Sequence, residues 1–220
     1  MRFAELVWRG SAAALLLGAA GCASVSEPVK AVTDTVASAT TAVAAAVTPE
    51  APLNPATQRA FDDASRALRA GQTAEAERGF RALAQSNPDL AGPHANLGLI
   101  QRQAGKLPES VTELERAVKL SPKQPVYLNQ LGITYRQQGQ FDKARDAYER
   151  AIAIDAAYAS AILNLGILYD LYLGDAKRAM EQYERYLALT PSGDATVTKW
   201  VAELKNRKPA PAAAPRKEKA

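Results

Sequence analysis

Two side chains that could carry chemistry of their own occur only once in this sequence. Cys22 is the only cysteine and His94 the only histidine among 220 residues. A single thiol excludes an intramolecular disulfide. The chain has no His/Cys metal constellation, no G-x-S-x-G nucleophile motif and no phosphate-binding loop. The sequence therefore predicts no catalytic residue, no metal site, no cofactor and no small-molecule substrate, and His94 is expected to serve packing.

Three amide side chains form the other chemically informative group. Asn96, Gln130 and Asn164 each stand directly before a Leu-Gly pair. An amide both donates and accepts hydrogen bonds, so it suits the backbone of a bound peptide whatever the peptide's side chains are. The alternative is that Asn96 and Asn164 hydrogen-bond between helices of this chain. The sequence leaves both interpretations open.

A fixed period positions these residues. Gly71, Gly105 and Gly139 are 34 residues apart, as are Pro88 and Pro122. A period between 20 and 50 residues indicates a repeat architecture. Four units follow, over residues 57–90, 91–124, 125–158 and 159–193.

Each unit is expected to contain two antiparallel helices. In the third unit Leu128, Leu131 and Tyr135 share one helix face, and Gly139 follows where that helix can end. A second helix then carries an apolar face, and neither helix can bury its face without a stacked neighbour. After the fourth unit, residues 194–207 are predicted to be a capping helix. The prediction is nine helices after residue 53.

The units resemble the tetratricopeptide repeat. The third unit supplies that family's pattern with Leu131-Gly132, Tyr135, Ala144, Tyr148 and Ala151. The fourth unit follows one residue late, because residues 170–174 hold an extra residue at the turn. The resemblance implies an all-α fold, a right-handed α-solenoid of four helix–turn–helix units plus a C-terminal capping helix. The tetratricopeptide repeat (TPR) domain would extend over residues 54–207. Gly98, Gly132 and Gly166 are expected where the two helices of a unit approach closely.

The resemblance also implies where a partner would bind. In tetratricopeptide repeat proteins the first helix of each unit lines a concave groove, and the recurring amides resemble the asparagine ladder of some members. The candidate groove residues are Asn96, Leu99, Arg102, Asn129, Gln130, Ile133, Arg136, Gln137, Asn164, Ile167 and Asp170. Leu99, Ile133 and Ile167 stand where chaperone-binding members carry Asn and Arg for a terminal carboxylate. This departure favours a partly apolar protein or peptide segment.

The N-terminus resembles a bacterial lipoprotein signal. Basic residues, an apolar run over 11–20 and Gly21 precede Cys22. The run is about half of the roughly 20 residues that span a bilayer. The resemblance implies a signal peptide over 1–21 and acylation of Cys22; the alternative is an ordinary signal with an incidental cysteine. Ala23 in place of Asp implies the outer membrane of a Gram-negative cell, facing the periplasm.

Residues 22–53 are predicted to be an Ala/Val/Thr-rich tether, although valines at helical spacing also allow a short helix over 29–47. Residues 208–220 form a basic Ala/Pro/Lys tail expected to be disordered. The net charge of +4 is concentrated near this tail. No basic helix stripe with interleaved aromatics points to nucleic acid.

The leading hypothesis is a non-enzymatic scaffold that binds protein partners and assists an envelope machine. It resembles lipoproteins such as the type IV pilus pilotins. Two alternatives remain: a structural tether or cell-wall-associated factor acting through the basic tail, and an adaptor that recruits peptidoglycan enzymes.

Overall fold

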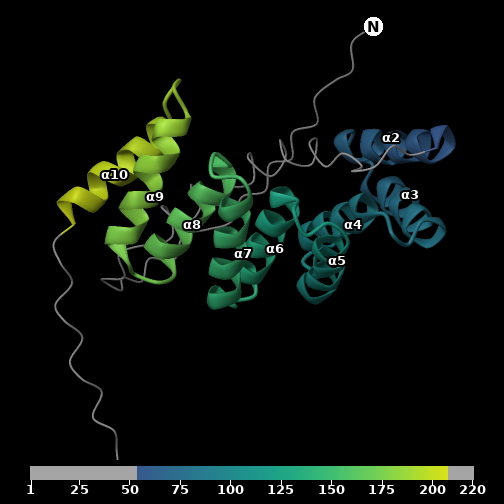
Figure 1. Cartoon of the computed structure of the whole chain (residues 1–220), viewed down its shortest axis with the longest axis horizontal. Coiled ribbons are helices and arrows are strands. Elements are labelled where there is room, and N and C mark those ends of the chain that lie inside the picture. The colour runs from purple at the N-terminus through teal and green to yellow at the C-terminus, as the bar shows by residue number, and fades with distance from the viewer. Residues whose placement is uncertain (1–53, 208–220) are drawn as a thin grey trace, which may run out of the picture.

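The computed structural model describes residues 54–207, which form nine α-helices and no strand within that range (Figure 1). The predicted signal peptide (1–21), tether (22–53) and tail (208–220) lie outside the described residues. The helices are α2 (Pro55–Arg69), α3 (Thr73–Ser86), α4 (Ala91–Gln103), α5 (Leu107–Leu120), α6 (Pro125–Gln137), α7 (Phe141–Ile154), α8 (Ala159–Leu171), α9 (Ala176–Leu189) and α10 (Ala195–Asn206).

The helices pack as four successive pairs and a final single helix. The pairs are α2 with α3, α4 with α5, α6 with α7, and α8 with α9, and each second helix also contacts the first helix of the next pair. The first helices of neighbouring pairs contact one another as well, α4 with α6 and α6 with α8. Figure 1 shows the pairs following one another from α2 to α10. This arrangement confirms the predicted nine-helix solenoid.

Helix ends lie where residue chemistry places them. Asn54 caps α2, its side-chain oxygen accepting hydrogen bonds from the backbone N–H groups of Ala56 and Thr57 at 3.1 and 2.9 Å. Pro55 opens the same helix, where its missing N–H costs nothing. Gly139 follows α6 with a φ of 75°, a conformation that a residue with a Cβ adopts only at a cost.

The helices of each pair approach closely at a glycine, as the sequence predicted. A Cβ on Gly132 would lie 2.6 Å from Cε1 of Tyr148, and one on Gly98 would lie 2.6 Å from Cγ of Leu114. At Gly166 the corresponding distance to Cδ1 of Tyr183 is 2.7 Å. These separations are well below van der Waals contact, so only glycine permits this helix spacing.

The fourth pair has the longer turn that the sequence predicted. Three residues separate α4 from α5 and α6 from α7, whereas four separate α8 from α9. The longer turn contains Tyr172, which is 41% exposed and packs against the ring of Phe141 with 5.1 Å between centroids. The extra residue thus brings an aromatic side chain back towards the preceding pair.

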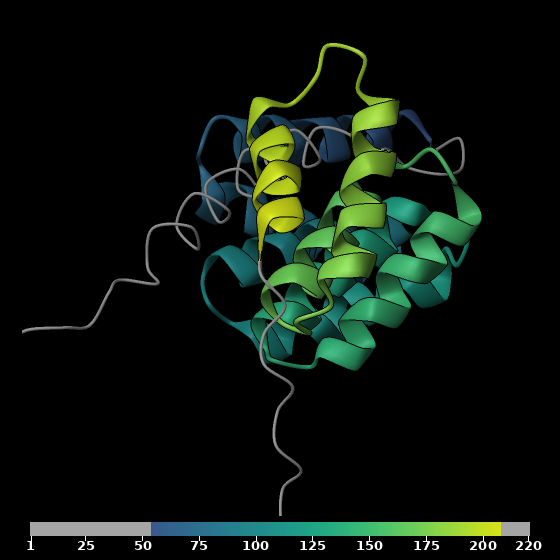
Figure 2. The same cartoon turned by 90° about the vertical axis from the view of Figure 1, so that its left-hand side faces the viewer.

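Helix α10 covers the end of the last pair. Val197, Val201 and Leu204 are buried, and Trp200 packs on Tyr183 of α9 with 5.5 Å between centroids. Figure 2 shows α10 lying alongside α9. Arg207, at the end of α10, reaches Asp170 of α8 at 2.8 Å. Lys205 of α10 also pairs with Glu184 of α9 at 2.9 Å, so the predicted capping role is carried by apolar burial and two ion pairs.

A candidate binding face on the first helices

The first helices α4, α6 and α8 are buried much more completely than the second helices. Ten successive residues of α6, Tyr127–Arg136, are all buried, whereas α7 buries only four of its 14 residues. Helix α6 contacts α4, α5, α7 and α8. The first helices therefore form the centre of the molecule rather than a surface layer with one apolar stripe.

The structure brings the predicted groove residues together on these helices, mostly beneath the surface. We call this set the first-helix face. Nine of its eleven members are 0–7% exposed: Asn96, Leu99, Arg102, Asn129, Gln130, Ile133, Arg136, Asn164 and Ile167. Gln137 is exposed at the end of α6, and Asp170 is partly exposed near the end of α8. The Asp170 side chain is only 7% exposed, and whether the face binds a partner remains a prediction.

The three recurring amides behave differently from one another. Asn96 Nδ2 donates to the backbone oxygen of Gly92 within its own helix at 2.9 Å. Asn164 Nδ2 donates across to Oδ1 of Asn129 on α6 at 3.1 Å. Gln130 is 2% exposed, and neither its Oε1 nor its Nε2 has a hydrogen-bond partner among residues 54–207. Two amides thus make internal hydrogen bonds, and the middle one keeps both of its polar atoms for another group.

Two arginines lie beside Gln130 in the same buried region. Arg102 is 6% exposed and its Nη1 donates to the backbone oxygen of Gln130 at 3.2 Å. Arg136 is 7% exposed, and its Nη1 has no hydrogen-bond partner. Neither guanidinium lies within 4.0 Å of a carboxylate of residues 54–207. Buried charges are normally paired, so this arrangement is energetically costly within residues 54–207 taken by themselves.

The two cations influence each other and a neighbouring phenol. Burial lowers the pKa of Arg102 to about 10, and the positive charge of Arg136 contributes to the lowering. Burial raises the pKa of Tyr148 to about 12, while Arg136 and Arg102 oppose that rise. The Tyr148 hydroxyl is buried and has no hydrogen-bond partner. Arg102, Gln130, Arg136 and Tyr148 therefore form one buried polar cluster with unpaired donors, which we call the arginine cluster.

An aromatic ring, that of Tyr172, and a carboxylate, that of Asp170, lie near the arginine cluster. The guanidinium of Arg136 lies 5.8 Å from the ring centroid of Tyr172, which is a cation–π distance. Asp170 occupies in the fourth unit the place that Arg102 and Arg136 occupy in the second and third. Its carboxylate is already bound by Arg207 at 2.8 Å and accepts from the Tyr183 hydroxyl at 3.5 Å.

Sequence reasoning missed the roles of Tyr148, Tyr172 and Arg207 around this face. The repeat pattern identifies Tyr148 as one of its aromatic positions, and nothing in the sequence signals a role for its hydroxyl. Tyr172 lies in the turn that the period had already marked as longer, so that irregularity was the available signal. Arg207 reaches Asp170 across 37 residues, a contact that no repeat spacing indicates.

His94 does more than fill space. Its Nδ1 lies 2.7 Å from Oε2 of Glu113 on α5, and its side chain is 15% exposed. The corresponding residues of the next two units, Leu128 and Ile162, are fully buried. His94 is thus mostly buried at the edge of the core and also hydrogen-bonds a carboxylate.

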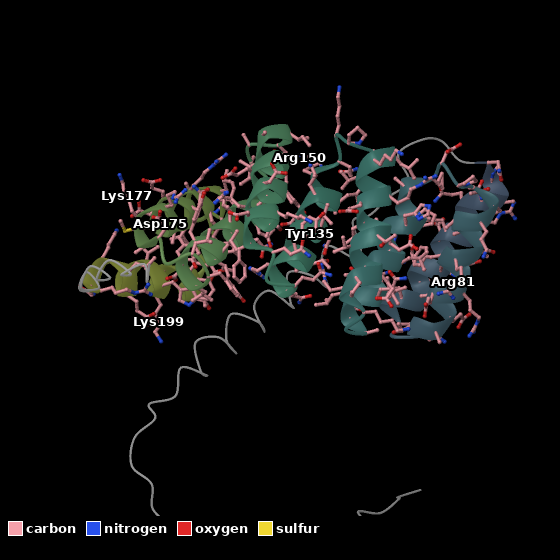
Figure 3. The ribbon with its side chains drawn as sticks, turned by 90° about the horizontal axis from the view of Figure 1, so that it is seen from below. Arg81, Tyr135, Arg150, Asp175, Lys177 and Lys199 are labelled. Carbon is pink, nitrogen blue, oxygen red and sulfur yellow. The ribbon has the colours of Figure 1, made fainter. Side chains whose placement is uncertain are left out.

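A second concave surface lies over α5, α6 and α7, away from the arginine cluster. It is a cleft of about 620 Å³ lined by Glu115, Val118, Lys119, Pro122, Leu131, Tyr135, Asp142, Lys143, Asp146, Ala147 and Arg150. Figure 3 labels two of these residues, Tyr135 and Arg150. The Tyr135 hydroxyl donates to Glu115, and Lys143 Nζ lies 5.3 Å from the Tyr135 ring.

The arrangement around Tyr135, a hydroxyl that donates to Glu and a cation beside the ring, recurs one unit later. The residues of this cleft therefore help to hold successive repeats together. Tyr169 donates to Glu149 at 3.2 Å, and the guanidinium of Arg178 lies 4.5 Å from the Tyr169 ring. Three acidic and three basic residues line the cleft, so it presents no net charge. The cleft joins successive repeats and favours no particular ligand.

Within residues 54–207 no group of three or more His, Cys, Asp or Glu side chains is arranged to hold a metal ion. None of the helices in that range combines the length and apolarity needed to cross a membrane.

The fold and this face define an α-solenoid built from helix–turn–helix repeats. Family models described as tetratricopeptide repeat match residues 89–157 and residues 129–194. Over residues 89–194 the chain matches the tetratricopeptide repeat family, whose members are protein-interaction scaffolds. A search of curated proteins found no match to the sequence.

Solved structures of similar fold include proteins from several sources. A crystal structure of the MamA protein is 23% identical with a TM-score of 0.60, covering 68% of this chain and 81% of its own. PilF from Pseudomonas aeruginosa is 21% identical with a TM-score of 0.63, covering 69% and 68%. The first repeat domain of Spaghetti (RPAP3), bound to the HSP90 peptide SRMEEVD, is 22% identical with a TM-score of 0.50, covering 53% and 90%. At these identities the likeness concerns the fold alone.

Proposed function

We propose that this chain is a non-enzymatic scaffold that binds a segment of a partner protein at its first-helix face. Acyl chains on Cys22 hold it at the outer membrane, facing the periplasm. There it assists assembly of an envelope complex such as a pilus or a secretion machine. The observation that carries the binding proposal is Gln130, a buried amide with neither polar atom bonded.

Gln130 supports binding because a buried polar group without a partner is costly. Leaving such a group unsatisfied costs about 1–3 kcal/mol, and a bound backbone offering one N–H and one C=O would satisfy both amide atoms. Leu99, Ile133 and Ile167 lie on the same face and suit an apolar neighbour on that segment. The peptide-bound RPAP3 domain supports the choice of a peptide segment as the ligand.

The envelope location rests on the sequence before the solenoid. Cys22 directly follows a short apolar run and is unique in the chain, and Ala23 follows it. Each acyl CH₂ buried in a membrane contributes about 0.8 kcal/mol, so acylation at this position can anchor the protein without a spanning helix. The resemblance to pilotins and the fold shared with PilF favour a role in assembling an envelope machine.

Replacing Gln130 by Met tests the binding proposal. The change removes both unpartnered polar atoms and keeps the side-chain length, so we expect the melting temperature to stay level or rise. Full-length protein carrying a crosslinker at the exposed Gln137 would be used to capture partners in envelopes of the source bacterium. Loss of two hydrogen bonds at about 0.5–1.5 kcal/mol each should reduce capture roughly ten-fold.

Gln182→Met is the matched control, because Gln182 lies on the second helix α9 and its Oε1 also lacks a partner. This variant should capture the same proteins as the unchanged chain. Equal capture by the Gln130 and Gln182 variants would contradict binding at the first-helix face.

A further inference from the structure

The charges around the first-helix face do not balance. Among residues 54–207, Arg102, Arg136 and Arg207 lie at this face, and only Arg207 has a carboxylate partner, that of Asp170. Because Arg207 holds Asp170 at 2.8 Å, the two arginines of the cluster are left without an acidic partner in residues 54–207. Both are at least nine-tenths buried, so water does little to compensate for their charge.

The arginine cluster contains several buried donors, and Arg102, Arg136 and Tyr148 lie close enough to influence one another's pKa. Arg102 Nη1 and the Gln130 backbone oxygen fix one side of the cluster at 3.2 Å. Arg136 Nη1, Gln130 Nε2 and the Tyr148 hydroxyl are buried donors without an acceptor. A carboxylate accepts several hydrogen bonds at once and carries the charge that would neutralise the two guanidinium groups.

Tyr172 is a partly exposed neighbour of this cluster. Its ring lies over Arg136 and is 41% exposed, and Leu171 beside it is 36% exposed. Apolar and aromatic surface is therefore exposed beside Arg136. Leu99 and Ile133 lie one helical turn before Arg102 and Arg136 on the same helices, which adds apolar contact beside the charge.

We propose that the arginine cluster is the docking point for an acidic side chain of the bound partner segment, an Asp or Glu flanked by apolar residues. Charge complementarity selects this occupant: two buried cations and three unpaired donors match one carboxylate. The proposal rests on the proposed function and adds the chemistry of its ligand. It differs from capture of a terminal carboxylate, since the cations lie one turn beyond Leu99 and Ile133.

Two synthetic peptides would probe this chemistry on the full-length chain: acetyl-ALAVEVALA-amide and the same peptide with Gln in place of Glu. Fluorescence anisotropy of labelled peptides should show at least ten-fold tighter binding of the Glu peptide. Arg136→Met should remove that preference. Arg150→Met, which changes an exposed arginine on α7, should keep it.

The melting temperature of the chain without peptide distinguishes a binding role of Arg136 from a structural one. If Arg136 only stabilised the fold, its replacement would lower the melting temperature. Because Arg136→Met removes an uncompensated buried charge, it should raise the melting temperature by about 2–4 °C. Sodium sulfate should not displace the bound Glu peptide, since the site is proposed for a peptide carboxylate.

Several results would overturn the proposal. Equal affinity for the two peptides, including no binding of either, is one. A second is a lower melting temperature for Arg136→Met together with an unchanged preference for the Glu peptide. A third is displacement of the Glu peptide by sulfate added at the same concentration of negative charge. Asp34 is an acidic residue of the predicted tether, outside the described residues. Equal, non-additive effects of Asp34→Asn and Arg136→Met on the melting temperature would assign the carboxylate to Asp34 instead of a partner.

The capture experiment separates this proposal from the proposed function. If Gln130→Met loses the captured partner while Arg136→Met keeps it, the face binds a partner but not through a carboxylate. If Gln130→Met keeps the partner, the binding face itself has been misassigned.

Discussion

Gly132 shows how a single missing side chain sets the spacing of a helix pair. Its backbone lies against the Tyr148 ring, and the same ring carries the hydroxyl of the arginine cluster. The residue therefore links packing to the candidate site, because any movement of the ring also moves that hydroxyl. Gly98 and Gly166 hold the same place in the second and fourth units, against Leu114 and Tyr183.

Gly132→Ala should lower the free energy of unfolding by about 1–3 kcal/mol, because the added Cβ would meet Tyr148 at 2.6 Å. The measurement is urea unfolding followed by circular dichroism. Gly139→Ala is the comparison: no atom lies within 4 Å of its added Cβ, and only the φ of 75° makes alanine unfavourable there. A cost of about 1–2 kcal/mol is expected at Gly139. Unchanged stability of Gly132→Ala would contradict the close contact.

At the scale of elements, α10 completes the stack by covering the exposed side of the last pair. It differs from the earlier helices in having no following unit to bury its outer side, so only Val197, Val201 and Leu204 are buried. Asp194 caps the helix by accepting from the backbone N–H groups of Thr196 and Val197. A terminal repeat needs such a polar-faced cap to protect its apolar side.

Val197→Ala should destabilise the protein by roughly 1–3 kcal/mol, since it removes two fully buried methyl groups and leaves a cavity against α9. Lys199→Ala on the exposed side of the same helix should change stability little, because its ion pair with Glu203 is 3.8 Å long and solvent-exposed. Thermal melts of the two variants provide the comparison. Equal melting temperatures for both would show that α10 does not protect the stack.

At the scale of the whole molecule, the solenoid has two buried clusters that meet in α4. One contains residues of α2 and α3 together with Leu97 and Ile100, and the other extends from α4 to α10. Repeats of this kind contact chiefly their neighbours, so one surface can be presented at a distance from an anchor. Cys22 stands 32 residues before Asn54, the first described residue.

Cys22→Ala should release the whole protein from membranes, because acylation is the only anchor we propose. The unchanged chain should label with radioactive palmitate and sediment with the membrane fraction, and the variant should do neither. Helical content by circular dichroism should be equal in both, since the solenoid begins at Pro55. An unmodified thiol at Cys22 in native protein, detected by mass spectrometry, would refute the anchor.

Much of the fold could be predicted from residue spacing. The 34-residue period placed the helix pairs, Asn54 and Pro55 marked the first helix start, and the small residue Gly132 marked a close approach. These features are local, because helix periodicity, capping and turn conformation depend on residues a few positions apart. The longer turn of the fourth unit could likewise be predicted, because the repeat pattern after Gly174 runs one residue late.

The candidate site depended on contacts between distant residues. Periodicity identified which residues share a helix face, but the depth of burial depends on how neighbouring helices pack around α6. The sequence therefore placed Gln130 and Arg136 on one face, and only the structure showed that they are buried without partners while Asn164 is bonded to Asn129. Arg207 and Asp170 pair across 37 residues for the same reason. Spacing along one helix determined the face, and tertiary packing decided which of its polar groups remain unpaired.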